Sequence, residues 1–210
     1  MKKALALVLL FFVAIIAQAQ NHFDLGLSLG AGNVISKANH DTALAKQLFD
    51  DMESMTDFDL SLAYYFKTQN SLGLEAFFDL GNGRGSVAGP TGQLLNGSLL
   101  QIALGLTLNY RWIADKHIMI LGGGVARMGM VETLSIPSER IEEEADCIGI
   151  PLKFKYEYRF NKSIGLGVST AAFLGSSNQI TETHNGHQTT EEGYTSFARW
   201  AITFGPRFYF

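Results

Sequence analysis

The chain ends in Trp200-Ala201-Ile202-Thr203-Phe204-Gly205-Pro206-Arg207-Phe208-Tyr209-Phe210, and the alternation in this stretch decides the fold. From Trp200 to Phe210 every second side chain is apolar, whereas most of the side chains between them are small or polar. Successive side chains of a β-strand point to opposite faces of the sheet. One face of this strand therefore suits lipid and the other suits a narrow, polar interior, as in the last strand of a membrane-spanning β-barrel.

The same two-residue repeat recurs upstream and predicts eight strands in all. They cover 23–31, 58–66, 72–80, 100–112, 117–130, 148–160, 164–172 and 200–210. The segment 117–130 is ambiguous, because three consecutive glycines at 122–124 hide its parity. We choose the parity that turns Arg127 inward, and this choice places on the outer face Ile118, Ile120, Ala126 and Met128.

Alternation alone does not say which face meets water, because a secreted, lipocalin-like barrel has its apolar face inside. Three features favour an apolar outer face. The opposite face is rich in Gly, Ala and Ser, which fit a lumen only wide enough for side chains to fill. Aromatic side chains gather where strands approach tight turns, as interfacial girdles do. Tight turns at 67–70, 113–116 and 161–163 also alternate with long loops at about 33–56, 81–97, 131–146 and 175–194.

The first residues have the features of a secretory signal peptide. Lys2 and Lys3 precede an apolar run from Ala4 to Ala17, and small residues at 17 and 19 provide a cleavage site. The apolar run is shorter than a permanent transmembrane helix, the competing interpretation. We therefore predict a signal peptide at 1–19 and one domain at 20–210. This domain is expected to be an all-β, eight-stranded, antiparallel, up-and-down transmembrane barrel in the cell outer membrane.

The composition limits the partners that the chain can bind. It has 16 Lys and Arg against 20 Asp and Glu, a formal net charge of −4, which falls to −6 without the two lysines of the signal peptide. Nucleic acid is not an expected partner, because phosphate binding needs clustered basic surface. Cys147 is the only cysteine, which excludes an intramolecular disulfide. We expect it to be a small inward-facing residue and not a nucleophile.

Three stretches of this sequence, together with the strand pattern over about 20–210, resemble a known family. They are Ile150-Pro151-Leu152-Lys153-Phe154-Lys155-Tyr156, Gly165-Leu166-Gly167 and the terminal Phe210. The chain is similar here to the eight-stranded outer-membrane β-barrel domain family of Gram-negative bacteria, which includes PorT-like and OmpX-like proteins. The resemblance implies the fold, the location and contact with outer-membrane lipid. It also implies that Phe208 and Phe210 form the signal read by the barrel-assembly machinery, a transient partner.

Charged residues at inward-facing positions are sorted by strand. The early strands carry Asp24, Asp57, Asp59, Glu75 and Asp79. The later strands carry Arg127, Lys153, Lys155, Arg159, Arg199 and Arg207, with Glu157 as the acidic exception. In a closed cylinder these two walls face each other. We therefore predict a charge network that closes the lumen, in preference to a charged conduit or proton relay. Its members are Asp59, Glu75, Asp79, Arg127, Lys153, Lys155 and Arg199.

The long outer loops carry two further signals. In the first loop, apolar residues at helical spacing predict a short amphipathic helix that packs over the barrel mouth, with a plug or partner-binding element as the alternative. These residues are Leu44, Leu48, Met52 and Met55, behind a capping Asp41. The loops are also acidic, which is typical of solvated surface and does not match the spacing of an EF-hand. Loops 33–56 and 131–146 are the expected contact sites for an extracellular or envelope protein.

Histidines are the remaining candidates for chemistry. His40, His184 and His187 lie in predicted loops, but none stands in a motif that marks a nucleophile or general base. The pair His184 and His187 has no convincing third metal ligand. The sequence thus predicts no catalytic residue, cofactor or metal. We expect a non-catalytic envelope scaffold, adhesin or secretion accessory; the alternatives are a porin-like pore for small solutes and a rim-site enzyme acting on lipid or peptide.

Overall fold

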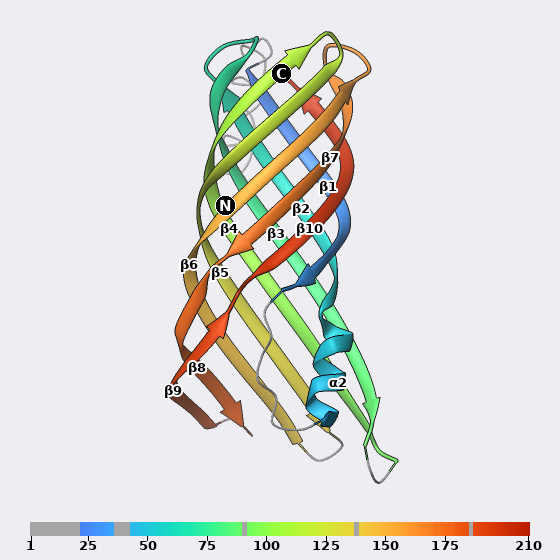
Figure 1. Ribbon diagram of the computed structural model, residues 1–210, viewed down its shortest axis with the longest axis vertical. Helices are drawn as coiled ribbons and strands as arrows, with labels where there is room; N and C mark the ends of the chain where they lie inside the picture. Colours follow the sequence, from blue (N-terminus) through green and yellow to red (C-terminus); the bar gives the residue numbers. More distant parts are fainter. Residues whose placement is uncertain (1–21, 36–42, 90–91, 137–138, 185–186) are drawn as a thin grey trace, which may run out of the picture.

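Eight antiparallel strands close into a barrel in the computed structural model, which describes residues 22–35, 43–89, 92–136, 139–184 and 187–210 (Figure 1). The ring consists of β1 (Phe23–Val34), β2 (Ser54–Tyr65), β3 (Ser71–Ala88), β4 (Leu94–Ala114), β5 (His117–Ile136), β6 (Glu139–Arg159), β7 (Ile164–Leu174) and β10 (Arg199–Tyr209). Strands adjacent in sequence pair along most of the ring, and β1 closes it by pairing with β10. The predicted fold class is therefore confirmed.

Two further strands, β8 (Ser176–His184) and β9 (His187–Ser196), prolong β7 and β10 beyond the ring. Only Gly175 separates β7 from β8, and its carbonyl oxygen accepts a hydrogen bond of 2.9 Å from the backbone N–H of Phe197. The hydrogen-bond ladder between β7 and β10 thus continues into the β8–β9 hairpin. On its other side β8 pairs with the outer part of β6.

The predicted long loops at 81–97, 131–146 and 175–194 are wrong, because strands occupy most of these segments. The outermost paired residues of β3 and β4 are Ala88 and Leu94, and those of β5 and β6 are Ile136 and Glu139. Outside the membrane neither face of a strand needs to be apolar, so the two-residue hydrophobic repeat that marks the transmembrane strands disappears. The predicted tight turns at 67–70, 113–116 and 161–163 lie together at the opposite end of the barrel, although β4 continues to Ala114 and shortens the second turn to 115–116.

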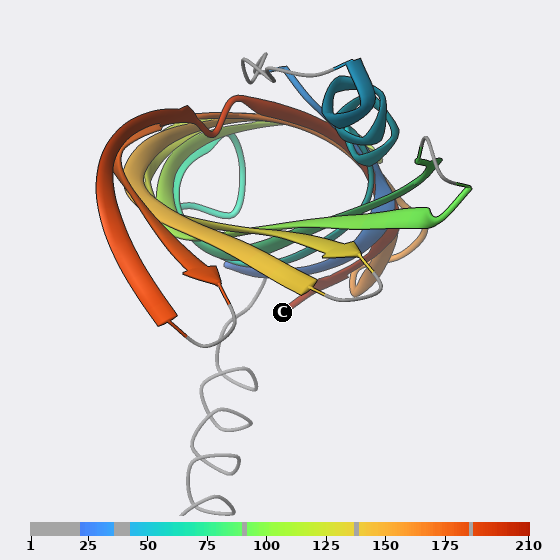
Figure 2. The same ribbon diagram turned by 90° about the horizontal axis from the view of Figure 1, so that it is seen from below.

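The barrel wall has unequal height. β1, β2, β7 and β10 stop at Val34, Ser54, Leu174 and Arg199, whereas β3, β4, β5 and β6 continue. Beyond this level the wall is an open sheet in the order β3-β4-β5-β6-β8-β9, which we call the outer sheet. Helix α2 (Ala43–Met52) lies at its β3 edge, at the rim of the barrel opening (Figures 1 and 2). At the other edge, β9 pairs with β8 alone among the described strands.

The amphipathic helix that the apolar spacing predicts is present as α2, and it packs at the rim of the mouth against β3 and β4 (Figure 2). Leu48 and Met52 are buried against Leu99 of β4 and Val87 of β3, both on lumen-facing positions. The backbone of Met52 lies so close to Gly83 that a Cβ atom there would collide with its carbonyl oxygen. Asp41 and the side chain of Leu44 lie outside the described residues, as do His40 and the predicted signal peptide at 1–19.

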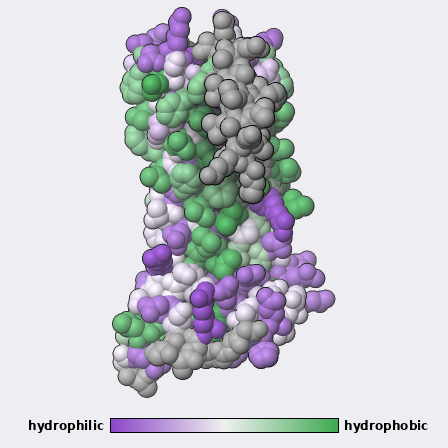
Figure 3. Space-filling view, turned by 180° about the vertical axis from the view of Figure 1, so that it is seen from behind, coloured by the Kyte–Doolittle hydropathy of each residue, from purple (hydrophilic) through white to green (hydrophobic). Residues whose placement is uncertain are grey.

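The outer wall of the barrel carries an apolar belt, one face of which is seen in Figure 3, and aromatic side chains border this belt. Exposed members of the belt include Leu29, Leu62, Leu74, Leu106, Val125, Leu152, Val168 and Phe204. Near the tight turns the exposed side chains are the aromatics Tyr64, Phe66, Tyr110, Trp112, Tyr156 and Phe160. Tyr110 and Trp112 pack edge to face, with ring centroids 4.5 Å apart. Such a belt with an aromatic girdle is typical of a barrel surrounded by lipid. No helix in the described part of the chain is long and apolar enough to cross a membrane.

The parity that we assigned to β5 is wrong. Ile118, Ile120, Ala126 and Met128 are all buried in the lumen, while the Arg127 side chain is 78% exposed on the outer wall. Ile118 and Ile120 pack there with Tyr65 and Tyr209, in an apolar layer that closes the end of the barrel near the tight turns. The predicted parity was chosen so that Arg127 would face the lumen. It did not take into account that this end of the lumen is filled by apolar side chains.

Candidate functional site

The described residues place six carboxyl groups and six cationic groups in the lumen, drawn from six of the eight strands of the ring. The carboxyl groups belong to Asp24, Asp57, Asp59, Glu75, Asp79 and Glu157, which are all buried. The cations are Arg111, Lys153, Lys155, Arg199 and Arg207, also buried, and the half-buried Arg159. An apolar layer lies on each side of this zone, one around Tyr65 and Tyr209 and the other around Phe77, Phe173 and Phe197.

The centre of the network joins β2 and β3 to β6 across the lumen. The Nζ atom of Lys153 lies 2.8 Å from Oδ2 of Asp59 and 3.4 Å from Oε1 of Glu75. Lys155 reaches the other oxygen of Glu75 at 2.7 Å, and the amide of Asn109 donates a hydrogen bond to the same oxygen. A buried carboxylate needs such partners to offset the loss of its hydration. Glu75 is therefore the carboxylate on which this part of the network converges.

On the outer side of this centre, one arginine joins two aspartates. Nη1 of Arg199 lies 3.0 Å from Asp57, and Nη2 contacts Asp79. The guanidinium carbon also lies 4.8 Å from the ring centroid of Phe173. The planar fork of an arginine suits this arrangement, since its two ends reach carboxylates on different strands. Arg199 thus ties β10 to both β2 and β3.

Towards the tight turns, two more arginines complete the network. Nε of Arg207 lies 3.1 Å from Glu157, whose other oxygen accepts a hydrogen bond from the hydroxyl of Tyr209. Arg111 pairs with Asp24 at 3.0 Å, and its guanidinium stacks on the ring of Tyr65 at 3.8 Å. Each of these four charges therefore has a partner of opposite sign on another strand. Arg159 differs, because its guanidinium stacks on the ring of Tyr209 at 4.2 Å and its Nε and Nη2 atoms have no hydrogen-bond partner among the described residues.

Glycines on the lumen face provide the room for these arginines. A Cβ atom at Gly81 would collide with Nη1 of Arg199, and one at Gly26 would lie 2.7 Å from Nη1 of Arg207. These glycines are among the small residues that identify the inward face in the sequence, and they leave the space that the arginine side chains occupy.

The structure brings six of the seven predicted network residues together. Asp59, Glu75, Asp79, Lys153, Lys155 and Arg199 contact one another as described. Arg127 does not belong to this network, because it pairs with the exposed Asp146 at 3.0 Å on the outer wall. The prediction omitted Arg111 and Asn109, although the unbroken alternation of 100–112 places both on the inward face. No described group of three or more His, Cys, Asp or Glu side chains is placed to hold a metal ion.

The outer sheet carries a second charged cluster, on the face that continues the lumen wall. Glu132 of β5 is directly opposite Glu143 of β6, which is directly opposite Glu182 of β8. Directly opposite residues project from the same face of a sheet, so three carboxylates stand in a row across neighbouring strands. Burial raises the pKa of Glu132 to about 7, and the negative charge of Glu143 contributes to the increase. We call these three residues the glutamate row.

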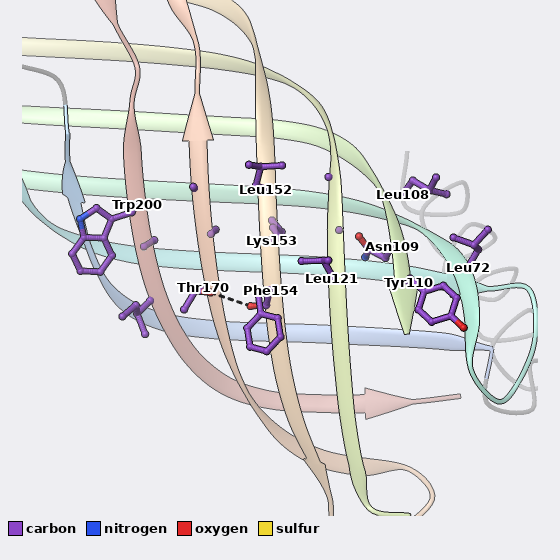
Figure 4. A pocket seen from close by; sticks show the side chains of 16 residues that line it. Leu72, Leu108, Asn109, Tyr110, Leu121, Leu152, Lys153, Phe154, Thr170 and Trp200 are labelled. Atoms are coloured by element: carbon purple, nitrogen blue, oxygen red, sulfur yellow. Dashed lines mark hydrogen bonds between the residues drawn. The ribbon is translucent and has the colours of Figure 1, made fainter. Parts of the chain in front are cut away.

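A shallow apolar groove lies on the outer wall (Figure 4). Gly122, Gly123, Ala171 and Ala172 are among its lining residues, and larger side chains from several strands surround them. The exposed apolar residues labelled on β5, β6 and β10 are Leu121, Leu152, Phe154 and Trp200. The groove belongs to the belt that faces lipid.

The described histidines are divided between the two ends of the barrel. Near the tight turns, Nδ1 of His22 donates a hydrogen bond of 2.6 Å to the carbonyl oxygen of Tyr65, and Nδ1 of His117 lies 2.7 Å from the hydroxyl of Tyr156. His184 and His187 lie at the far tip of the β8–β9 hairpin. Cys147 points inward beside Gly175, as predicted.

The C-terminal aromatics lie on the outer wall at the closing seam. Phe208 and Phe210 are both half-buried, and the backbone of Phe210 exchanges two hydrogen bonds with that of Phe23, of 2.8 and 3.1 Å. The role of Phe208 and Phe210 as an assembly signal stays a prediction.

No protein-family model matches this sequence, and no curated protein matches it. Solved structures do match. The outer membrane protein OprG from Pseudomonas aeruginosa has a TM-score of 0.60 at 15% identity, covering 93% of this chain and 99% of OprG. The outer membrane protease OmpT from Escherichia coli has a TM-score of 0.53 at 10% identity, covering 91% and 97%. The chain has the fold of an outer-membrane β-barrel.

A third similar structure is that of Ail, the attachment invasion locus protein of Yersinia pestis, in complex with the heparin analogue sucrose octasulfate. It has a TM-score of 0.51 at 11% identity and covers 90% of this barrel and 99% of Ail. The predicted location in the outer membrane is confirmed by the apolar belt of the barrel together with the outer-membrane origin of OprG and OmpT. At these identities the similarity extends to the fold and not to an activity.

Proposed function

We propose that the protein is a non-catalytic barrel that anchors the acidic outer sheet in the membrane and presents it to a basic polypeptide partner. The observation that carries this proposal is that the acidic residues stand on hydrogen-bonded strands. Segment 131–146 has six acidic residues and one arginine, and 176–196 has three acidic residues and neither lysine nor arginine. A sheet that is already ordered loses little conformational entropy when it binds, so its charges act together on a partner.

The paired charges of the lumen support this function over that of a small-solute pore. The ion pairs of Lys153, Lys155 and Arg207 span the interior at 2.7 to 3.4 Å, and the side chains that form them are buried. A conduit for charged solutes needs groups that can exchange their partners for the solute. The lumen network instead ties opposite strands together, which suits a rigid anchor.

The sign of the charge on the outer sheet supports a basic partner. The structure of Ail contains an anionic heparin analogue. An anion of that kind would be repelled by the glutamate row and by Glu142, Glu144, Glu191 and Glu192. One edge of β9 has no partner among the described strands, and its backbone hydrogen-bonding groups can pair with an extended segment, which is a common mode of peptide recognition. The proposed partner is therefore a lysine- or arginine-rich segment in an extended conformation.

Binding of a fluorescent, arginine-rich peptide to the full-length barrel in detergent tests this proposal. We expect affinity that decreases with salt and falls at least about tenfold when Glu142, Glu143 and Glu144 are replaced by Gln. Asp115→Asn, at the turn on the opposite side of the membrane, is the control and is expected to leave binding unchanged. Equal binding by the triple variant, or preference for heparin over the basic peptide, would contradict the proposal.

A further inference from the structure

The tip of the β8–β9 hairpin brings together two histidines that the lumen and the acidic surface do not use. Only Asn185 and Gly186 separate His184 from His187 in the sequence, and the two histidines are directly opposite each other in the register of β8 and β9. Both side chains are exposed. Directly opposite residues project from the same face with Cβ atoms about 4.5 to 5.5 Å apart, so the two imidazoles can converge on one point.

We propose that His184 and His187 form a two-histidine site for a divalent transition-metal ion such as Zn²⁺. Imidazole nitrogens bind this ion at about 2.0 to 2.1 Å, and two rings that converge from opposite strands can both reach it. Water molecules complete the coordination, since no third described ligand is placed to contribute. This inference concerns a different ligand from the basic partner and does not depend on the proposed function.

The surroundings of the histidine pair favour a cation. Glu182 precedes His184 by two residues and therefore projects from the same face, about 6.6 Å away along the strand. Glu143, opposite Glu182, adds a second negative charge on that face. On the other side of His184 the neighbouring strand presents Ile141, which offers no competing charge. The glutamate row thus attracts a cation to the tip, while the imidazoles select a transition metal over calcium, which prefers oxygen ligands.

The charged groups that face the histidine pair are acidic. They are Glu182 from its own strand and Glu143 from β6; the neighbouring Arg140 instead pairs with Glu142 at 2.8 Å.

The test is calorimetric titration of the full-length barrel in detergent with Zn²⁺. We expect one ion per chain, with affinity reduced at least about tenfold by His184→Ala or His187→Ala. His117→Ala, near the tight turns, is the matched control and is expected to bind as the wild type does. Gel mobility before and after boiling verifies that each variant is folded.

A second variant tests whether the two histidines must project from the same face, because it keeps the number of histidines in the hairpin unchanged. His187→Gln combined with Gln188→His keeps both histidines in the hairpin but moves one imidazole to the opposite face. This variant should bind Zn²⁺ as weakly as His187→Ala. Wild-type affinity in the rearranged variant, or in His184→Ala combined with His187→Ala, would overturn the proposal. Loss of binding only when Glu132, Glu143 and Glu182 are replaced by Gln would also overturn it, since the carboxylates would then hold the ion.

Discussion

Arg199 illustrates how a single residue determines the state of the lumen. Its guanidinium is buried and contacts carboxylates on two other strands, Asp57 and Asp79. Removing one member of a buried ion pair leaves the remaining charge buried without its partner. The resulting decrease in the free energy of unfolding exceeds the net stabilisation that the intact pair provides. By contrast, Arg127 and Asp146 form an ion pair of similar length in which both side chains remain in contact with solvent or headgroups.

The two arginines therefore make a matched pair of variants. Arg199→Met is expected to lower the free energy of unfolding by about 3 to 5 kcal/mol, because two buried carboxylates lose their cation. Arg127→Met should change it by less than about 1 kcal/mol, as exposed pairs do. Urea titration of the refolded barrel in detergent, followed by gel mobility, measures both. Equal destabilisation by the two variants would show that burial does not determine the contribution of these arginines.

Gly205 controls the approach of the first and last strands. A Cβ atom at this position would collide with the backbone carbonyl oxygen of Leu27, which cannot move without shifting β1. We expect Gly205→Ala to lower the free energy of unfolding by about 1 to 3 kcal/mol. Gly129→Ala is the control, because no atom lies within 4 Å of the added methyl group. The same urea titration distinguishes the two variants. If Gly205→Ala left the free energy of unfolding unchanged, β1 and β10 would be able to move apart at no cost.

At the level of elements, the sequence predicts the transmembrane strands well and the outer strands poorly. Residues 100–112 and 200–210 alternate because lipid and lumen impose opposite demands on the two faces. Beyond the membrane neither face has to be apolar, so the sequence of 131–146 does not alternate and predicts an acidic loop. In the structure β5 and β6 pair along this segment. Arg127 was misplaced for a related reason. The glycines at 122–124 remove the alternation that would have shown its face, and only the packing of Ile118 and Ile120 in the lumen decides the parity.

The β5–β6 hairpin should become less stable as the pH rises. In the unfolded hairpin Glu132 has its ordinary pKa of 4.5, whereas in the sheet its pKa is about 7. Between these values the folded form binds more protons, so stability present at pH 4.5 is lost as the pH rises through 7. The change over this whole range should amount to about 3 kcal/mol, since one pKa unit corresponds to about 1.4 kcal/mol.

Hydrogen exchange of the amides in 130–146 at pH 5 and pH 8, corrected for intrinsic rates, measures this effect. Glu132→Gln should abolish the pH dependence, because the titrating group is removed. Glu142→Gln should retain it, since Glu142 lies on the opposite face, where it pairs with Arg140. A hairpin that is more protected at pH 8 than at pH 5 would contradict the assignment.

For the whole molecule, the lumen network leads to a prediction about ion conduction. The intact barrel should not conduct steadily in planar bilayers, because buried ion pairs and apolar layers fill its interior. Replacing Asp59, Glu75 and Asp79 together by Ala leaves Lys153, Lys155 and Arg199 without these partners, so water should enter. Small anion-selective currents are then expected, because the remaining lining is basic.

Single-channel recordings of the two proteins at equal reconstitution density test this prediction. Replacing the surface residues Glu142, Glu143 and Glu144 by Gln provides a control with the same number of charges removed. Stable currents through the wild type, with no change of selectivity in the lumen variant, would favour the pore over the anchor.

The position of Arg199 and Arg207 on the last strand has a consequence for the order of biogenesis. Their partners, Asp57 and Asp79 on earlier strands and Glu157 on β6, are synthesised before β10 exists. Until β10 docks between β1 and β7, these carboxylates lack the cations that neutralise them in the finished barrel. An incomplete sheet thus carries excess negative charge on the face that must become the dry interior, which opposes its release into the lipid. Closure of the ring and electrical neutrality of the lumen are reached in the same step.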